Sequence, residues 1–309
     1  MDSLPLDTSN PAIRDYLALV RLQVLTPLSL LINIATVLVC ATIAKPSIGD
    51  ITRLYPTSIS FHPGVVAVYV LLIYIGQVGY CLLLVFARKP ETKKALVKAV
   101  GLSLVLANWA MAFWAIAWVL QFFLASTILL GILVLLLAYS NIALLLYHTP
   151  LISHPLDVAL IHAPLRLFLI LPLSLIFPYS LFITLGLTHL PDHPEQYGRN
   201  TWPGFAVMLS VNLLGLMVII LHRDITWAIA ATWICVSEWS VRPKPPPVFV
   251  VVVLFTVLHP LALVSTIMHD IFFKQRQRGA IALPADDDYH QPVSQGRQGP
   301  REVDTETWG

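Results

Sequence analysis

About eight long apolar runs fill almost the whole interval between residues 25 and 270 of this 309-residue chain. A helix of about 20 apolar residues crosses the hydrocarbon core of a bilayer and satisfies its own backbone hydrogen bonds there. With 57% hydrophobic and 12% charged residues, the chain has more apolar surface than a water-soluble fold of this length can bury. The runs predict an all-α fold: a polytopic membrane helical bundle with about eight transmembrane helices.

Charged residues and prolines separate these runs, as at Lys45-Pro46 and in the proline-rich stretch 242–247. The span 225–241 is short and is bounded by Asp224 and Glu238; if it lies in the membrane interface instead, the count drops to seven. The expected spans are 25–44, 64–87, 97–119, 125–147, 166–187, 204–221, 225–241 and 247–270.

Charge placement predicts the orientation. With eight spans, most Lys and Arg residues of the connections lie on the side of the N-terminus, which places both termini in the cytoplasm. The chain then divides into a cytoplasmic N-terminal segment (1–24), the transmembrane bundle (25–270) and a polar cytoplasmic tail (271–309). The tail has too little apolar content to fold and should be mostly disordered. The choice of organelle is left open.

Several function classes lack support in the sequence. The net charge of +2, spread over membrane boundaries, does not indicate nucleic acid as a partner. Three cysteines, Cys40, Cys81 and Cys235, lie in or beside apolar runs and read as buried small hydrophobes. No glycine-rich phosphate loop, nucleophile elbow or histidine box appears. We therefore assign no catalytic residue and no cofactor. The sequence favours a non-enzymatic role over an enzymatic one.

Ionisable residues within the apolar runs would point to function, because they are costly in a bilayer. Only His259 lies well inside a span, whereas Asp157, Asp224, Glu238 and Asp270 lie in a loop or at span ends. Histidines gather in two connections, and we favour ordinary interfacial residues over a metal site at both. These are His148, His154 and His162 in one connection, and His189 and His193 around Asp192 in the other.

Aromatic and amide residues recur at helical spacing and form the candidate ligand site. Trp114 and Trp118 are four residues apart and share a helix face, and Tyr69 and Tyr80 fall on another. An interior lined in this way suits a flat apolar ligand such as a tetrapyrrole, a sterol or an isoprenoid. The alternative is that these residues serve helix packing and interfacial belts. The candidates are Tyr69, Tyr80, Asn108, Trp109, Trp114, Trp118 and Tyr179.

Four sequence segments resemble the tryptophan-rich sensory (TspO, or translocator) proteins and their enlarged fungal-type relatives. They are Ile59-Ser-Phe-His-Pro-Gly64, Asn108-Trp109-Ala-Met-Ala-Phe-Trp114, Leu171-Pro172-Leu-Ser174 with Tyr179, and Arg223-Asp224-Ile-Thr-Trp227 with Trp233, in the order of that family. The chain departs from the family pattern at Val68 and Tyr69, where Phe and Trp are usual. The resemblance implies porphyrin-like or sterol-like ligands.

The sequence favours a multi-pass membrane protein that binds or carries a small hydrophobic ligand. A first alternative is a membrane enzyme acting on a lipophilic metabolite, such as an isoprenoid cyclase, which requires carboxylates to converge on one cavity. An ion pair between Asp224 and Arg223 or Arg166 would instead indicate a structural role for that carboxylate. A second alternative is a partner-binding subunit with a small-residue face at Gly76 and Gly79, and a homo-oligomer is left open.

Overall fold

The computed structural model describes residues 11–86, 95–147, 158–190, 193, 196 and 198–278. The expected disorder of the tail beyond residue 278 falls outside these residues, as do His148, His154, Asp157 and Asp192. Residues 1–267 form one compact unit and residues 268–309 a second one, which holds the last turns of the final helix. The account below concerns the first unit.

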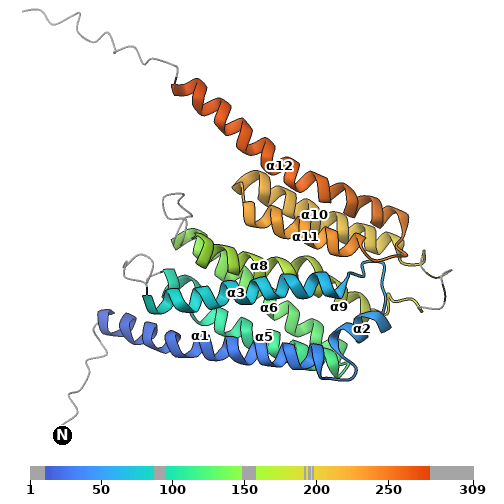
Figure 1. Cartoon of the computed structure of the whole chain (residues 1–309), viewed down its shortest axis with the longest axis horizontal. Helices are drawn as coiled ribbons and strands as arrows, with labels where there is room; N and C mark the ends of the chain where they lie inside the picture. The colour runs from blue at the N-terminus through green and yellow to red at the C-terminus, as the bar shows by residue number, and fades with distance from the viewer. Residues whose placement is uncertain are drawn as a thin grey trace, which may run out of the picture. The chain divides into compact units, whose positions relative to one another are not determined.

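Helices account for nearly all of the described chain (Figure 1). Three short segments, labelled η, are π-helical turns that continue directly into α-helices. The order is α1 (Pro11–Thr42), α2 (Ile48–Leu54), α3 (Pro63–Phe86), η1 (Ala95–Val100), α5 (Gly101–Val119), α6 (Phe123–Tyr147), η2 (Val158–His162), α8 (Ala163–Leu171), η3 (Pro172–Ile176), α9 (Phe177–Thr184), α10 (Thr201–His222), α11 (Ile225–Trp239) and α12 (Pro246–Arg278).

The polytopic helical bundle is confirmed, but seven rather than eight of the described helices reach spanning length. The expected span 225–241 corresponds to α11, which has 15 residues. A helix of that length rises about 22 Å, less than the ~30 Å of a hydrocarbon core. The seven are Tyr16–Thr42, Pro63–Phe86, Gly101–Val119, Phe123–Leu146, Ala159–Thr184, Thr201–His222 and Pro246–His269.

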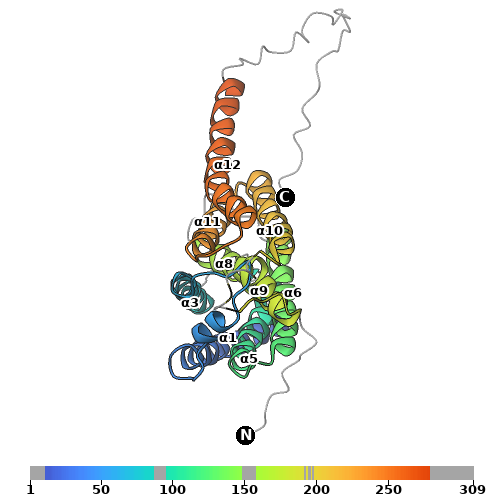
Figure 2. The ribbon, with the colours of Figure 1, turned by 90° about the vertical axis from the view of Figure 1, so that its right-hand side faces the viewer.

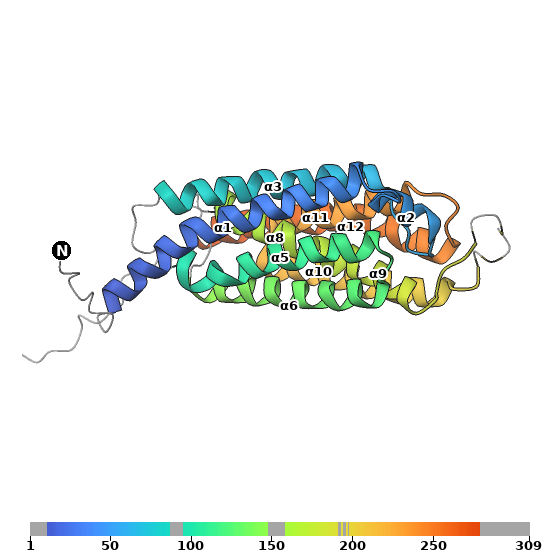
Figure 3. The same cartoon turned by 90° about the horizontal axis from the view of Figure 1, so that it is seen from below.

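Although short, α11 runs back along the bundle. It begins at Ile225, three residues after α10 ends at His222. At its other end, the Ser237 carbonyl oxygen accepts a hydrogen bond of 2.9 Å from the backbone N–H of His62, directly before α3. The last turn of α11 therefore lies at the end of the bundle where α3 begins (Figure 3). The chain thus passes between the two ends of the bundle eight times, once on a helix of less than spanning length.

The first helix starts well before its apolar run. We expected a span from residue 25, whereas α1 begins at Pro11. Leu19 and Leu22 are buried in the bundle, while Arg14 and Arg21 are exposed. An amphipathic stretch of this kind continues a helix beyond the apolar residues, because one face stays packed while the charges point outward.

The continuous helix α8–η3–α9 forms the centre of the bundle (Figure 2). In its most apolar stretch of 18 residues, 72% is buried within the bundle. The corresponding share is 28% in the spans of α1, α3, α10 and α12. It contacts α3 and α6 on one side and α10 and α11 on the other. The outer helices therefore present most of their apolar surface away from the bundle, as lipid-facing helices do.

Candidate functional site

The sequence-predicted aromatic residues on α5 and α9 form one packed cluster. Trp118 is its centre: its ring lies 6.0 Å from Trp114, 5.5 Å from Phe123 and 5.9 Å from Tyr179 between centroids. Tyr179 also makes an edge contact with Phe61 at 5.1 Å. Trp118 is 1% exposed and Tyr179 is fully buried. In this arrangement the rings occupy the space between the helices themselves.

The hydroxyl groups of the predicted tyrosines bond to backbone carbonyls. Tyr69 donates to the Leu167 carbonyl at 3.0 Å, and Tyr80 donates to that of Leu96 at 3.4 Å. Tyr179 donates to the carbonyls of Thr52 and Tyr55 at 2.9 and 2.8 Å. Each bond joins segments far apart in sequence, so these tyrosines connect α3 and α9 to their neighbours.

Asn108 and the tryptophans of α5 keep unused donors. The Asn108 side-chain oxygen accepts a hydrogen bond from the amide of Asn33 at 2.8 Å. Its own NH2 group, and the indole N–H groups of Trp114 and Trp118, are buried and have no hydrogen-bond partner among the described residues. Trp109 differs from them, because it is only half-buried and stacks on Phe113 at 5.7 Å.

A buried ion pair joins the central helix to α11. Arg166 of α8 and Asp224 lie 2.7 Å apart, with side chains 12% and 3% exposed. Asp224 is also the N-cap of α11, where its carboxylate accepts the backbone N–H of Trp227 at 3.1 Å. A carboxylate at a helix N-terminus is favoured by the helix dipole. Asp224 therefore has the structural role that such an ion pair would indicate.

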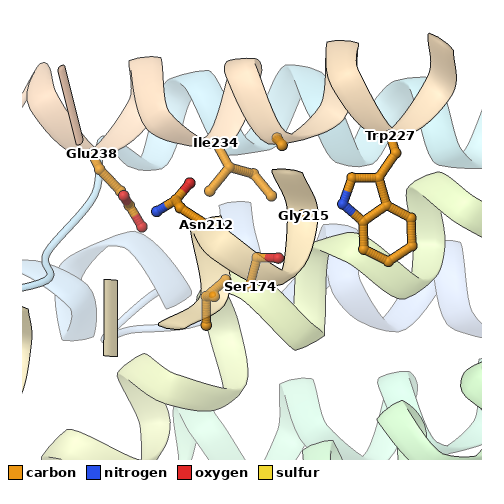
Figure 4. Close-up of a pocket in the computed structure, with 8 residues that line it drawn as sticks. Ser174, Asn212, Gly215, Trp227, Ile234 and Glu238 are labelled. Atoms are coloured by element: carbon orange, nitrogen blue, oxygen red, sulfur yellow. The ribbon is translucent and has the colours of Figure 1, made fainter. Parts of the chain in front are cut away.

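A small cavity lies between η3, α10 and α11 (Figure 4). The cavity volume within which the centre of a water molecule can move is about 10 Å³. This is room for about one water. Its polar lining comes from Ser174, Asn212 and Glu238, and Trp227 is its large aromatic residue. The remaining walls are small or aliphatic: Val211, Gly215, Ala231 and Ile234. The lining resembles that of a ligand site in combining apolar walls with few polar groups, but the volume is far below the roughly 300 Å³ at which such sites begin.

The polar groups of the cavity differ in how far they are satisfied. The Asn212 amide donates to the Met208 carbonyl at 2.8 Å and accepts from the Cys235 thiol at 3.1 Å. Its backbone carbonyl lies 3.3 Å from Nε2 of His259. Glu238 is 1% exposed, and neither of its carboxyl oxygens has a hydrogen-bond partner in the described structure. Glu238 is thus the unsatisfied group of this site.

Lys244 stands beside the cavity, in the connection between α11 and α12. Its ammonium group donates to the carbonyls of Ser58 and Ser60 at 3.3 and 2.9 Å. Burial lowers the pKa of Lys244 to about 8, an effect that the nearby Glu238 opposes. Segment 55–62, to which both serines belong, is itself buried at Ile59. Lys244 therefore ties this segment to the end of α11.

None of the seven predicted ligand-site residues lines this cavity. Of its lining, Ser174 and Trp227 belong to the family-like segments, and Glu238 was considered as a carboxylate at a span end. Asn212 was missed, although an amide in the middle of the apolar run 204–221 was the available signal. No group of three His, Cys, Asp or Glu residues that could hold a metal ion occurs in the part of the chain that the structure describes.

Comparison with known proteins adds one match. A family model described as TSPO-like protein matches residues 23–265. Neither a curated protein nor a solved structure matches the chain. The matched region starts within α1 and ends within α12, so it includes the aromatic cluster and the cavity. The chain is therefore a multi-pass membrane protein that belongs to the TSPO-like protein family.

Proposed function

We propose that this protein binds a small hydrophobic ligand inside its helical bundle, as a carrier, sensor or store and not as an enzyme. The observation that supports this most directly is the cavity between η3, α10 and α11. It combines apolar walls, the indole of Trp227 and the unsatisfied carboxyl group of Glu238. A buried polar group without a partner is costly, and a bound ligand can supply the missing hydrogen bond.

Ligand binding requires the helices around the cavity to separate, because about 10 Å³ holds only a water molecule. α10 is suited to such movement, since one stripe of it is buried and the rest of its apolar surface faces outward. Gly215 lies on that stripe. A Cβ placed on Gly215 would lie 3.1 Å from the indole nitrogen of Trp227. A small outward shift of α10 at Gly215 would enlarge the cavity beside Trp227.

The aromatic cluster is the second part of the proposed binding region. Trp114, Trp118 and Asn108 keep buried N–H groups that could donate hydrogen bonds to a ligand carbonyl. Tyr69, Tyr80 and Tyr179 would act indirectly, by holding the helices that carry these donors. Trp109 would contribute ring surface at the edge of the region.

The two alternatives have less support. Asp224 is engaged by Arg166 and does not line the cavity, whereas Glu238 does, so of these two carboxylates one is available to the cavity and the other is not. The small-residue face proposed for a partner is used within the chain. A Cβ on Gly76 would lie 2.7 Å from Cγ of Pro164, and one on Gly79 would lie 2.8 Å from Leu160.

Identification of bound molecules tests the proposal. The full-length protein is purified in nanodiscs, extracted, and its small molecules are compared by mass spectrometry with those of a Trp114→Phe/Trp118→Phe variant and of Glu238→Leu. We expect a hydrophobic compound that is enriched in the wild type and depleted in at least one variant. Phe keeps the aromatic ring and removes the donor, and Trp202→Phe, at a tryptophan that is 71% exposed, serves as control. The same bulk lipids in all samples would contradict the proposal.

A further inference from the structure

Three elements direct polar side chains into the cavity between η3, α10 and α11. Glu238 of α11 is 1% exposed, and neither of its carboxyl oxygens has a hydrogen-bond partner among the described residues. Asn212 of α10 and Ser174 of η3 supply the other polar groups of the lining. In Figure 4 the carboxyl group of Glu238 and the amide group of Asn212 face each other across this space. The cavity is therefore apolar on most sides and polar between these three residues.

Glu238 and Asn212 face each other without a direct hydrogen bond. One N–H of the Asn212 amide donates to the Met208 carbonyl at 2.8 Å, and the amide oxygen accepts from the Cys235 thiol at 3.1 Å. The second N–H is left over, yet it does not reach either carboxyl oxygen of Glu238. Two facing polar groups that do not bond directly can be joined by a water molecule between them.

The size of the cavity matches one water molecule. The centre of a water can move within about 10 Å³, which is close to the smallest volume that holds a water. A buried water typically makes about three hydrogen bonds. Glu238, Asn212 and Ser174 together offer that number.

A water molecule also fits the lining in either protonation state of Glu238. It can donate to a carboxylate and accept from a carboxylic acid, while its other hydrogen and lone pair serve Ser174 and the second N–H of Asn212. As a neutral molecule it adds no charge to a buried region, where an unbalanced charge is costly. The water therefore satisfies the carboxyl group whatever its charge.

We infer that the cavity between η3, α10 and α11 is a binding site for one ordered water molecule, which bridges Glu238, Asn212 and Ser174 in the ligand-free protein. This site goes beyond the proposed function, because the water occupies it without a hydrophobic ligand. Ser174 lies in a π-helical turn, a feature that is frequent at functional sites. The water connects the central helix with α10 and α11, so a ligand that displaces it has to replace its hydrogen bonds.

Radiolytic labelling tests this site. The full-length protein is freed of co-purifying molecules by repeated detergent exchange and reconstituted in phosphatidylcholine nanodiscs. An X-ray pulse converts ordered water into hydroxyl radicals, which oxidise the adjacent side chains, and peptide mass spectrometry locates the added oxygen. We expect oxidation of Trp227, which lines the cavity, to be faster than that of Trp118, which is 1% exposed and packed against three other rings.

Two variants remove the water in different ways. Glu238→Leu takes away one hydrogen bond and should lower the oxidation of Trp227 by up to about tenfold, the change in occupancy expected for that loss. Val211→Ile adds a methyl group to the lining and should displace the water by its volume. The matched control is Val218→Ile, at a half-buried valine of the same helix outside the lining, which should leave the oxidation unchanged.

Thermal stability of the same variants separates a bound water from overpacking. Val211→Ile should lower the thermal midpoint, because the displaced water leaves Glu238 unsatisfied. In the Glu238→Leu background the same change should not lower it, whereas overpacking would lower it in both backgrounds. A dry cavity would instead gain stability from the added methyl group in the wild type.

The water site is wrong if Trp227 of the wild type is oxidised no faster than Trp118, or if folded Glu238→Leu and Val211→Ile retain full oxidation. Should Glu238→Leu fail to fold, Val211→Ile and its control decide the question alone. None of these results depends on a hydrophobic ligand, so the identification of co-purifying molecules decides the proposed function separately.

Discussion

The two carboxylates of α11 show how strongly the environment of a residue determines its role. Asp224 compensates a nearly buried arginine and caps the helix, so its charge is matched within the chain. Glu238 has no such partner at hydrogen-bonding distance. In a membrane-embedded bundle, the first arrangement stabilises the fold and the second leaves a group available to a ligand.

Loss of the charge on Asp224 should destabilise the protein. Asp224→Asn keeps an oxygen that can cap α11 but leaves Arg166 without its counter-charge, which should lower the free energy of unfolding by about 3–5 kcal/mol. Asp224→Ala also removes the cap and should cost about 1 kcal/mol more. SDS-induced unfolding in detergent measures both values. The double variant Arg166→Met/Asp224→Asn should recover part of the loss, and equal stability of wild type and Asp224→Asn would contradict the role of the ion pair.

Lys244 predicts a dependence of stability on pH. Its pKa is lowered to about 8 in the folded protein, from an ordinary value of 10.5. Between these two values the unfolded chain retains a proton that the folded protein has released, so stability should rise with pH in this window. The thermal midpoint of the wild type should therefore increase relative to that of Lys244→Met between about pH 8 and pH 10.5. Parallel profiles of the two proteins would show that Lys244 is not buried in this way.

At the scale of elements, apolar length and end signals predicted most helices well. The expected spans 64–87 and 204–221 became α3 (Pro63–Phe86) and α10 (Thr201–His222). The short helix α2 was not predicted, because it contains no apolar run. It is set by a capping box in which Ser47 and Asp50 bond to each other's backbone N–H. Local hydrogen bonding of this kind is not visible in a hydropathy pattern.

The close approach of α3 to α8 gives a prediction at this scale. A Cβ on Gly76 would lie 2.7 and 2.9 Å from two ring carbons of Pro164, which cannot move aside. Gly76→Ala should therefore lower the free energy of unfolding by about 1–3 kcal/mol. Gly198 has nothing within 4 Å of such a Cβ, so Gly198→Ala is the matched control and should be neutral. If the two variants melt together, α3 and α8 are not in this contact.

At the scale of the whole molecule, the sequence predicts which residues are apolar but not which ones meet. Trp114 and Trp118 were expected on one helix face, yet the contact of Trp118 with Tyr179 of α9 depends on how the helices pack. That Glu238 of α11 and Asn212 of α10 line the same cavity likewise has no signal in the spacing of residues. Contacts between distant segments follow from tertiary packing, which a single sequence does not reveal.

The number of crossings can be tested by topology mapping. If α11 crosses the bilayer despite its 15 residues, both ends of the chain lie on one side and the connection 185–200 lies on the other. A glycosylation acceptor inserted after Gly198 should then be modified, whereas acceptors at either terminus should not, given the excess of Lys and Arg on the side of the termini. Modification of the C-terminal acceptor as well as the one after Gly198, with the N-terminal acceptor unmodified, would show that α11 stays on one side of the membrane.

Segment 55–62 has a consequence for how molecules reach the interior. Tyr179 and Lys244 bond to its carbonyls from two sides, and the backbone N–H of His189 donates to the carbonyl of Pro56 at 3.1 Å. These bonds hold segment 55–62 against this end of the bundle, while most of the apolar surface of α10 faces away from the bundle. Ligand exchange through α10 would draw on the bilayer as its reservoir. Occupancy would then follow the membrane partition coefficient of a compound, and a poorly soluble molecule at a trace aqueous level could still fill the site.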